Sequence, residues 1–283
     1  MTPSVLLQYA LPHRLLSRIV YWATRWTWRP WKNFLIARVV RAYRVDMGQA
    51  LVEEPAAYAT FNAFFTRALK DGARPLPDDP RAFVSPADGR ISQIGAIADG
   101  RIFQAKGQDF SAAELLGDED AAAPYRDGQF VTVYLSPRDY HRFHMPLAAR
   151  VLRATYIPGA LWPVNRMGVE GVDGLFVQNE RLCAFLGVEG DATTACLVAV
   201  GATMVGKVRV AFDDLTTNVP ADGPISRVYA NRTPRFAKGE EWGRFEFGST
   251  IVMIAAAGLL ELDSQPPGTM LRLGQRIGRL CRR

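Results

Sequence analysis

Short apolar runs separated by turn residues fill the chain between about positions 82 and 258. Runs of this kind, bounded by Gly, Pro and Asp-Gly, are typical of β-strands. Because they are not alternated with long helical patterns, a doubly wound parallel fold is disfavoured and a mainly antiparallel β core is expected. The clearest predicted strands are residues 129–135, 151–157, 182–188, 195–200, 205–212 and 245–254.

The first 70 residues show helical periodicity instead. Residues 1–45 predict two helical pieces separated at Pro30, and residues 53–70 predict a further helix with aromatic residues at helical spacing. Residues 71–81 contain three prolines and no periodicity, which indicates a linker. We therefore expect an α+β protein with helical region 1–70, linker 71–81, β-rich core 82–263 and tail 264–283.

The first helical piece places arginine beside tryptophan and leucine, and four of the six tryptophans fall within ten residues. A membrane interface selects this combination, because indole suits the headgroup boundary and guanidinium meets lipid phosphate. The alternative is a helix packed on the body, with arginine outward and tryptophan inward. The candidates for membrane contact are Arg14, Arg18, Trp22, Arg25, Trp26, Trp28, Arg29 and Trp31.

The net charge of +6 is concentrated at the two ends of the chain. Residues 1–45 hold eight basic side chains and residues 264–283 hold five, neither with any acid, so the body between them carries −7. Basic ends of this kind indicate an anionic partner, either a membrane surface or nucleic acid. The arginines of the tail would also share one face of a short amphipathic helix.

Cysteine content and hydropathy limit the class of protein. Three cysteines, none in a CxxC pair, argue against a disulfide scaffold or a zinc site and for a reducing compartment. No uncharged apolar run reaches the roughly 18 residues that a spanning helix needs. We expect a soluble or peripheral protein.

Two of the three histidines, His141 and His144, lie in SPRDYHRFHMP (136–146). A metal site would need more carboxylates or cysteines than Asp139 alone. Proton transfer near neutral pH is the better interpretation of the pair. The alternative is one structural and one exposed histidine.

Gly248-Ser249-Thr250 lies inside the apolar run 245–254, where glycine would weaken a strand and indicates close backbone approach. Ser249 could attack the carbonyl of Gly248 if a general base removed its hydroxyl proton. An Asp–His–Ser set commonly supplies that base. Asp88, in SPADG (85–89), is on its own a turn former.

Six segments together resemble the bacterial, membrane-associated phosphatidylserine decarboxylases, in both order and spacing. The cleavage motif of that family usually begins with Leu and here begins with Phe247, which keeps an apolar residue before the Gly-Ser bond. The segments are FNAFFTRALKDGARP (61–75), VSPADGRI (84–91), VYLSPRDYHRFHMP (133–146), YIPGALWPVN (156–165), VGATMVGKV (200–208) and KGEEWGRFEFGST (238–250).

The resemblance implies a zymogen that cleaves itself between Gly248 and Ser249 into a β chain, 1–248, and an α chain, 249–283. The Ser249 residue would become a pyruvoyl group, the only cofactor, with neither metal nor pyridoxal phosphate. That ketone would accept the electrons released when phosphatidylserine loses carbon dioxide and becomes phosphatidylethanolamine.

The resemblance also implies residue roles. Asp88 would orient and charge His144, and His144 would deprotonate Ser249, which makes Asp88 a member of a triad. His141 is the candidate proton donor to the headgroup α-carbon. Apart from the resemblance, we expect an apolar pocket for the substrate carboxylate, because the charge is lost more easily out of water. We draw it from Phe143, Met145, Leu161 and Trp162, with core packing as the alternative, and expect loop 163–179 to cover it.

The expected partners are phosphatidylserine and the anionic membrane surface, to which the protein would attach peripherally on the cytoplasmic face. The two chains of the precursor would stay associated with each other. Whether the protein also forms a homodimer is left open. Nucleic acid is disfavoured because the body is acidic. A serine hydrolase with Asp88, His144 and Ser249 is the first alternative, although it lacks the G-x-S-x-G elbow. A pyridoxal phosphate enzyme, with only five lysines to choose from, and a non-enzymatic membrane-binding module are the others.

Overall fold

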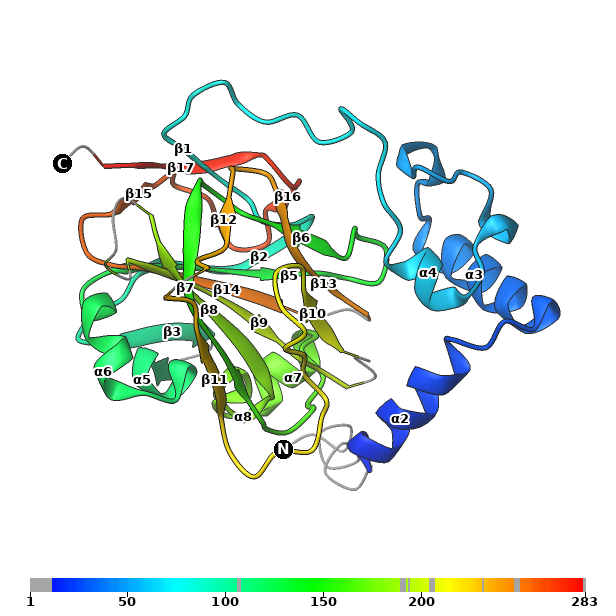
Figure 1. Cartoon of the computed structure of the whole chain (residues 1–283), viewed down its shortest axis with the longest axis horizontal. Coiled ribbons are helices and arrows are strands. Elements are labelled where there is room, and N and C mark those ends of the chain that lie inside the picture. The colour runs from blue at the N-terminus through cyan, green and yellow to red at the C-terminus, as the bar shows by residue number, and fades with distance from the viewer. Residues whose placement is uncertain are drawn as a thin grey trace.

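The structure is a computed structural model that describes residues 12–105, 108–188, 192, 194–203, 207–230, 232–246 and 250–281. Its helices are short and lie mainly at the N-terminus and on one face of a large sheet (Figure 1). They are α2 (His13–Ala23), α3 (Arg29–Tyr43), α4 (Phe61–Phe65), α5 (Ala112–Leu116), α6 (Glu119–Ala122), α7 (Arg166–Gly171) and α8 (Leu175–Gln178), with 3-10 turns at Met47–Gln49, Pro55–Ala57 and Ala123–Tyr125.

Strands make up most of the remaining fold. They are β1 (Ala82–Val84), β2 (Gly89–Ala96), β3 (Arg101–Ala105), β4 (Gln108–Ser111), β5 (Gln129–Tyr134), β6 (Arg142–His144), β7 (Ala149–Ile157), β8 (Arg181–Gly187), β9 (Ala195–Val200), β10 (Val208–Val210), β11 (Ile225–Val228), β12 (Arg235–Phe236), β13 (Glu241–Phe245), β14 (Thr250–Ala255), β15 (Leu260–Leu262), β16 (Met270–Leu271) and β17 (Arg276–Leu280). The expectation of an α+β protein with a mainly antiparallel β core is confirmed.

The main sheet runs β11-β7-β8-β9-β14-β5-β2-β16, with β12 also paired to β7, and each of these pairings is antiparallel. Strand β14 lies near its centre and is buried along its length. Alternate side chains of a strand face opposite sides of a sheet. Ile251 and Met253 therefore join the core under the small sheet β10-β13-β6, while Val252 and Ile254 join the core under α5–α8.

The first helices form a lobe beside the sheet (Figure 1). Helices α3 and α4 share a separate apolar cluster that includes Ile36, Phe61, Phe64 and Phe65. Helix α2 runs from this lobe along the lower right of the sheet in Figure 1. None of the helices that the structure describes is both long and apolar enough to cross a membrane.

The helix expected over 53–70 is wrong in length. Only Phe61–Phe65 is α-helical, preceded by a 3-10 turn at Pro55–Ala57. Thr60 ends the preceding extended chain and caps α4, because its hydroxyl accepts a hydrogen bond from the amide of Ala63 at 3.0 Å. Loop 163–179 likewise contains α7 and α8.

The helix expected in the C-terminal tail is also wrong, because the tail adds β16 and β17 to the sheets. Strand β17 lies between β1 and β15, along the top of Figure 1. Gly278 permits the close pairing, since a Cβ there would lie 2.6 Å from the carbonyl oxygen of Glu261. Arg276 and Arg279 form ion pairs within this sheet, with Asp263 at 3.3 Å and Glu261 at 2.7 Å. These two tail arginines are therefore engaged by the protein's own carboxylates.

The apolar run 245–254 is divided between two strands. Strand β13 ends at Phe245 in the small sheet, and β14 begins at Thr250 in the main sheet. The chain therefore changes sheets at the position where the sequence places glycine and serine.

Candidate active site

A tight turn aims the histidine segment into the small sheet. The carboxylate of Asp139 accepts hydrogen bonds from the amide and hydroxyl of Ser136, at 2.7 and 2.6 Å. The amide of Asp139 also donates to the carbonyl of Ser136 at 2.9 Å, and this turn ends the extension of β5 and directs the following residues toward β6. Phe143 then enters the core, so the flanking residues His144 and Arg142 face the other side of the strand.

His141 is fully buried, and its ring lies against Phe65, with centroids 4.0 Å apart. Its Nδ1 is 2.8 Å from the carbonyl oxygen of Asp139, which can only accept, so Nδ1 carries the proton. Burial, together with the positive charge of Arg67, lowers the pKa of His141 to about 3. The ring is therefore neutral near pH 7. Its Nε2 is buried and has no hydrogen-bond partner among the described residues.

His144 has the same tautomer but different surroundings. Its Nδ1 is 2.8 Å from the carbonyl oxygen of Gly239, and its Nε2 is 3.3 Å from the hydroxyl of Tyr140. Burial lowers the pKa of His144, and the Gly239 carbonyl and the charges of Glu241 and, less strongly, Asp88 partly oppose this. A neutral imidazole with its lone pair on Nε2 can act as a general base.

Asp88 contacts a different partner from the one expected. Its Oδ1 accepts from Nε of Arg74 and from the amide of Leu273, each at 2.8 Å, and Nη2 of Arg74 binds Oδ2. Within the described part of the chain, Asp88 makes no hydrogen bond to His144. The guanidinium fork matches a carboxylate in two places, which explains why this pairing is preferred. Among the described residues, the effect of Asp88 on His144 is electrostatic, because its negative charge raises the pKa of His144.

The residues expected to react, Gly248 and Ser249, lie outside the described residues, as does Phe247. The described residues on either side of them make defined contacts. The amide of Phe245 donates to the carbonyl of His141 at 2.9 Å, and Thr250 opens β14 with a buried hydroxyl that has no partner among the described residues. Three residues allow a separation of at most about 15 Å between the Cα atoms of Glu246 and Thr250.

The chain is similar to proteins of a known family. A family model described as phosphatidylserine decarboxylase matches residues 61–279, and another, described as PSD, matches residues 3–44. A phosphatidylserine decarboxylase proenzyme of Alkalilimnicola ehrlichii is 49% identical over 88% of this chain and 86% of its own. A protein of the same name from Ectopseudomonas mendocina is 47% identical over 97% and 96%, and one from Bordetella bronchiseptica is 48% identical over 95% and 92%.

The chain belongs to the phosphatidylserine decarboxylase family. The relatives are carboxy-lyases by name and are made as proenzymes. The match covers both the histidine segment and the segment that contains Gly248 and Ser249.

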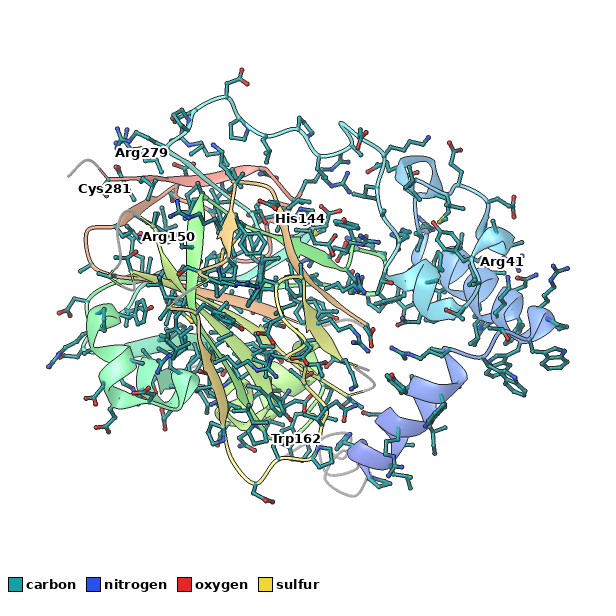
Figure 2. All side chains as sticks on the ribbon, in the orientation of Figure 1. Arg41, His144, Arg150, Trp162, Arg279 and Cys281 are labelled. Carbon is teal, nitrogen blue, oxygen red and sulfur yellow. The ribbon has the colours of Figure 1, made fainter. Side chains whose placement is uncertain are left out.

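The four residues assigned to a substrate pocket do not converge in this family member. Phe143 and Met145 are fully buried in the core between the sheets, where Phe143 packs on Trp242 at 4.5 Å between centroids. Trp162 instead packs against the other core cluster and donates its indole N–H to Gln178 at 3.1 Å. Figure 2 shows His144 and Trp162 well apart. Core packing therefore accounts for Phe143 and Met145.

Leu161 lines a cavity of about 610 Å³ between α2 and the core. The wall of the cavity contacts Glu246, because the carbonyl of Lys207 accepts the amide of Glu246 at 2.9 Å. Its lining includes Arg18, Tyr21, Trp22, Leu161, Glu180 and Lys207. Apolar, basic and acidic side chains thus line this space together.

Some of the basic and tryptophan side chains expected to contact a membrane are exposed, and others contact the rest of the protein. Arg18, Trp22, Trp26, Trp28 and Arg29 are exposed. Leu15 and Ile19, which extend the apolar stripe of α2, are more than half exposed.

Two of the expected membrane residues are used inside the protein instead. Trp31 donates its indole N–H to the carbonyl of Ala23 at 2.9 Å, and Arg25 pairs with Glu246. The side chain of Arg14 lies outside what the structure describes.

Sequence reasoning missed Arg74, Tyr140 and the carbonyl of Gly239. Tyr140 had a signal, since it lies four residues before His144 in the histidine segment. Arg74 lies in a quoted segment, but its partner is across the linker. A backbone acceptor such as Gly239 has no signature in a sequence.

Proposed function

We propose that this protein converts phosphatidylserine to phosphatidylethanolamine with a pyruvoyl group made from Ser249 by cleavage of the Gly248–Ser249 bond. The observation that carries the proposal is the full-length similarity to relatives named phosphatidylserine decarboxylase proenzyme. Two neutral histidines in the segment that pairs with β13 support it, because both keep a lone pair on Nε2; His141 lies next to Phe245 and His144 lies opposite Glu241.

Self-cleavage needs no outside reagent except water. Ser249 Oγ attacks the carbonyl carbon of Gly248, the C–N bond breaks, and an ester forms with a free amine on Ser249. Removal of the α-proton of Ser249 then breaks the Cβ–Oγ bond and releases Gly248 as a carboxylate. The remaining dehydroalanine tautomerises to an imine, and water replaces its nitrogen as ammonia. The pyruvoyl carbonyl is left in amide linkage to Thr250.

His144 is proposed as the base for the first step. A hydrogen bond to the carbonyl of Gly239 holds its Nδ1 proton and directs its Nε2 lone pair away. Tyr140 contacts that lone pair at 3.3 Å, a long bond that a serine hydroxyl could replace. The negative charge of Asp88 favours the imidazolium that forms when His144 takes the proton.

Two buried polar atoms without a partner among the described residues suit a small ketone and its amine substrate. The Thr250 hydroxyl can donate to a ketone oxygen, and the lone pair on His141 Nε2 can accept from a bound amine. The pyruvoyl group supplies a ketone that condenses with the serine headgroup amine and takes up the electron pair left by carbon dioxide.

His141 is proposed to return the proton to the α-carbon of the headgroup. Its pKa of about 3 in the free protein makes the protonated ring rare at neutral pH. A bound substrate brings a carboxylate and a phosphate, whose negative charge raises a neighbouring histidine pKa. Protonation of His141 is therefore coupled to substrate binding.

Peripheral attachment to an anionic membrane, on the cytoplasmic face, is part of the proposal. The exposed apolar residues of α2, with Trp22 70% exposed, and the arginines beside them support it. Each basic residue near an anionic surface contributes about 1 kcal/mol. The cavity between α2 and the core then lies next to the surface that holds the lipid.

Denaturing mass spectrometry of the purified protein tests the proposal. We expect two chains divided at Gly248–Ser249, with the smaller one ammonia lighter than a chain that begins with serine. Ser249→Ala should give one intact chain without decarboxylase activity. An intact chain with full activity would refute the pyruvoyl mechanism, and hydrolase activity from an intact chain would favour the serine hydrolase.

A further inference from the structure

The C-terminal end of α2 is fixed to the helical lobe. The carbonyl of Thr24 accepts the amide of Asn62 at 2.9 Å, and the carbonyl of Ala23 accepts the indole N–H of Trp31 at 2.9 Å. These carbonyls would otherwise be unpaired at a helix end. The position at which Arg25 leaves the helix is therefore well defined.

Arg25 connects this helix end to the core. Its Nη1 donates to the carbonyl of Tyr21 at 3.0 Å, and its guanidinium lies 3.5 Å from the centre of the Tyr21 ring. With the guanidinium held in this way, Nη2 binds Oε2 of Glu246. The side chain of Arg25 is only 22% exposed, so solvent screens this pair less than a surface pair.

Glu246 is held from a second direction as well. Its Oε1 accepts from Nε of Arg209 at 2.8 Å, and its backbone amide donates to the carbonyl of Lys207. The residue is buried, and a buried carboxylate is retained only where charges and hydrogen bonds compensate for its lost hydration. Two arginines from separate parts of the chain meet this requirement.

Glu246 is also the last described residue before the expected cleavage bond, two positions ahead of Gly248. The side chain that fixes it follows the C-terminal end of α2, and Leu15, Ile19 and Trp22 of that helix are exposed. One short segment therefore presents an apolar surface and, just after its helix ends, holds Glu246.

We propose that Arg25 is a positioning residue for self-cleavage, which ties the upstream arm of the cleavage segment to helix α2 through the Glu246 carboxylate. This inference rests on the proposed cleavage at Gly248–Ser249. Self-cleavage needs the Gly248 carbonyl within reach of Ser249 Oγ, and misplacement of a reacting atom by about 1 Å can cost on the order of 100-fold in rate. Arg209 fixes the same carboxylate from the core side.

Conversion of newly made chain tests the inference. Cell-free translation with labelled methionine, followed on denaturing gels, gives the rate at which intact chain becomes two chains. We expect Arg25→Ala and Glu246→Gln to slow conversion by at least about tenfold, and Arg25→Lys to restore part of the rate by keeping the charge. Arg41→Ala is the matched control, because Arg41 is an exposed arginine of α3, away from the core in Figure 2. It should convert like the wild type.

A structural contribution is separated by measuring the melting temperature of each variant in a Ser249→Ala background and following conversion well below it. Slow conversion by a folded Arg25→Ala chain supports the positioning role. Conversion of that variant at the wild-type rate overturns the inference. If the wild-type chain itself is never cleaved yet decarboxylates its substrate, the proposed function fails instead, so the two failures are distinguishable.

Discussion

Arg74 binds both carboxylate oxygens of Asp88, with Nε 2.8 Å from Oδ1 and Nη2 on Oδ2. Both side chains are 11% exposed, and the bond raises the pKa of Arg74. His144 meanwhile depends on the carbonyl of Gly239 for its orientation. Asp88 therefore combines a structural ion pair with a longer-range charge effect on His144.

Substitution at each end of this pair should separate the two effects. Either Asp88→Asn or Arg74→Gln breaks a largely buried pair, so we expect each to lower the free energy of unfolding by about 3–5 kcal/mol. Only Asp88→Asn removes the negative charge that favours protonated His144, so its self-cleavage should be about tenfold slower than that of Arg74→Gln. Urea unfolding and gel-based cleavage rates measure the two quantities. Equal cleavage rates in the two folded variants would leave Asp88 with a structural role alone.

The two histidines should have different effects when replaced. His144→Ala removes the proposed base, and we expect self-cleavage to fall by 10²–10⁴-fold, the usual contribution of a general base. His141→Ala should still cleave, while turnover of phosphatidylserine falls. Mass spectrometry reports cleavage, and release of labelled carbon dioxide reports turnover. If His141→Ala accumulates intact chain as His144→Ala does, this division of roles is wrong.

The sequence identified these chemical groups but not their contacts. His141, His144 and Asp88 were found because histidine is rare in this chain and the segments resemble a known family. The pairing of Asp88 with Arg74 depends on how linker 71–81 folds back, and no local pattern encodes this. Phe143 of β6 and Met145 just after it were assigned to a pocket, because the same apolar residue types line pockets and fill cores.

In the fold, too, local patterns predicted some elements correctly, while elements that depend on distant pairing were missed. Strand β9 was predicted with its observed bounds, because its apolar run is bordered by turn residues. The tail was mistaken for a helix because Arg276 and Arg279 fit a helical stripe, whereas in β17 both lie at the exposed side and pair with carboxylates of the neighbouring strand. Pairing partners distant in sequence override a weak local preference.

Burial of His141 should make stability depend on pH. The pKa of His141 is about 3 in the folded protein and 6.5 in the unfolded chain. Above about pH 6.5 the ring is neutral in both states, and the folded protein keeps its full stability. As the pH falls toward 3, only the unfolded chain binds the proton, so the free energy of unfolding decreases. The shift corresponds to about 2 kcal/mol at pH 5. Urea unfolding of the uncleaved Ser249→Ala chain should therefore lose about 2 kcal/mol more between pH 7 and 5 than the same chain with His141→Asn. Parallel losses in the two chains would contradict a depressed pKa.

The exposed apolar side chains of α2 and of the turn that follows it should govern attachment to lipid. Trp22 and Trp26 are 70% and 57% exposed. Burying a large apolar side chain contributes about 1.5–3 kcal/mol, so replacing both with Ala should weaken flotation with phosphatidylserine-containing vesicles by at least about tenfold. Phe103→Ala is the control, because Phe103 is a half-exposed aromatic of β3. Equal binding by the double variant and the control would place the lipid-binding surface elsewhere.

Cleavage should leave the two chains joined by their strands. Strands β14, β16 and β17 would belong to the α chain, yet they pair with β5 and β9, with β2, and with β1 of the β chain. We expect both chains to co-elute in gel filtration and to separate only in denaturant. Ile277→Ala, at a fully buried position of β17, should lower the free energy of unfolding by about 2–5 kcal/mol. Arg272→Ala, an exposed site in the same tail, is the control, and loss of the α chain from the wild-type protein without denaturant would contradict this pairing.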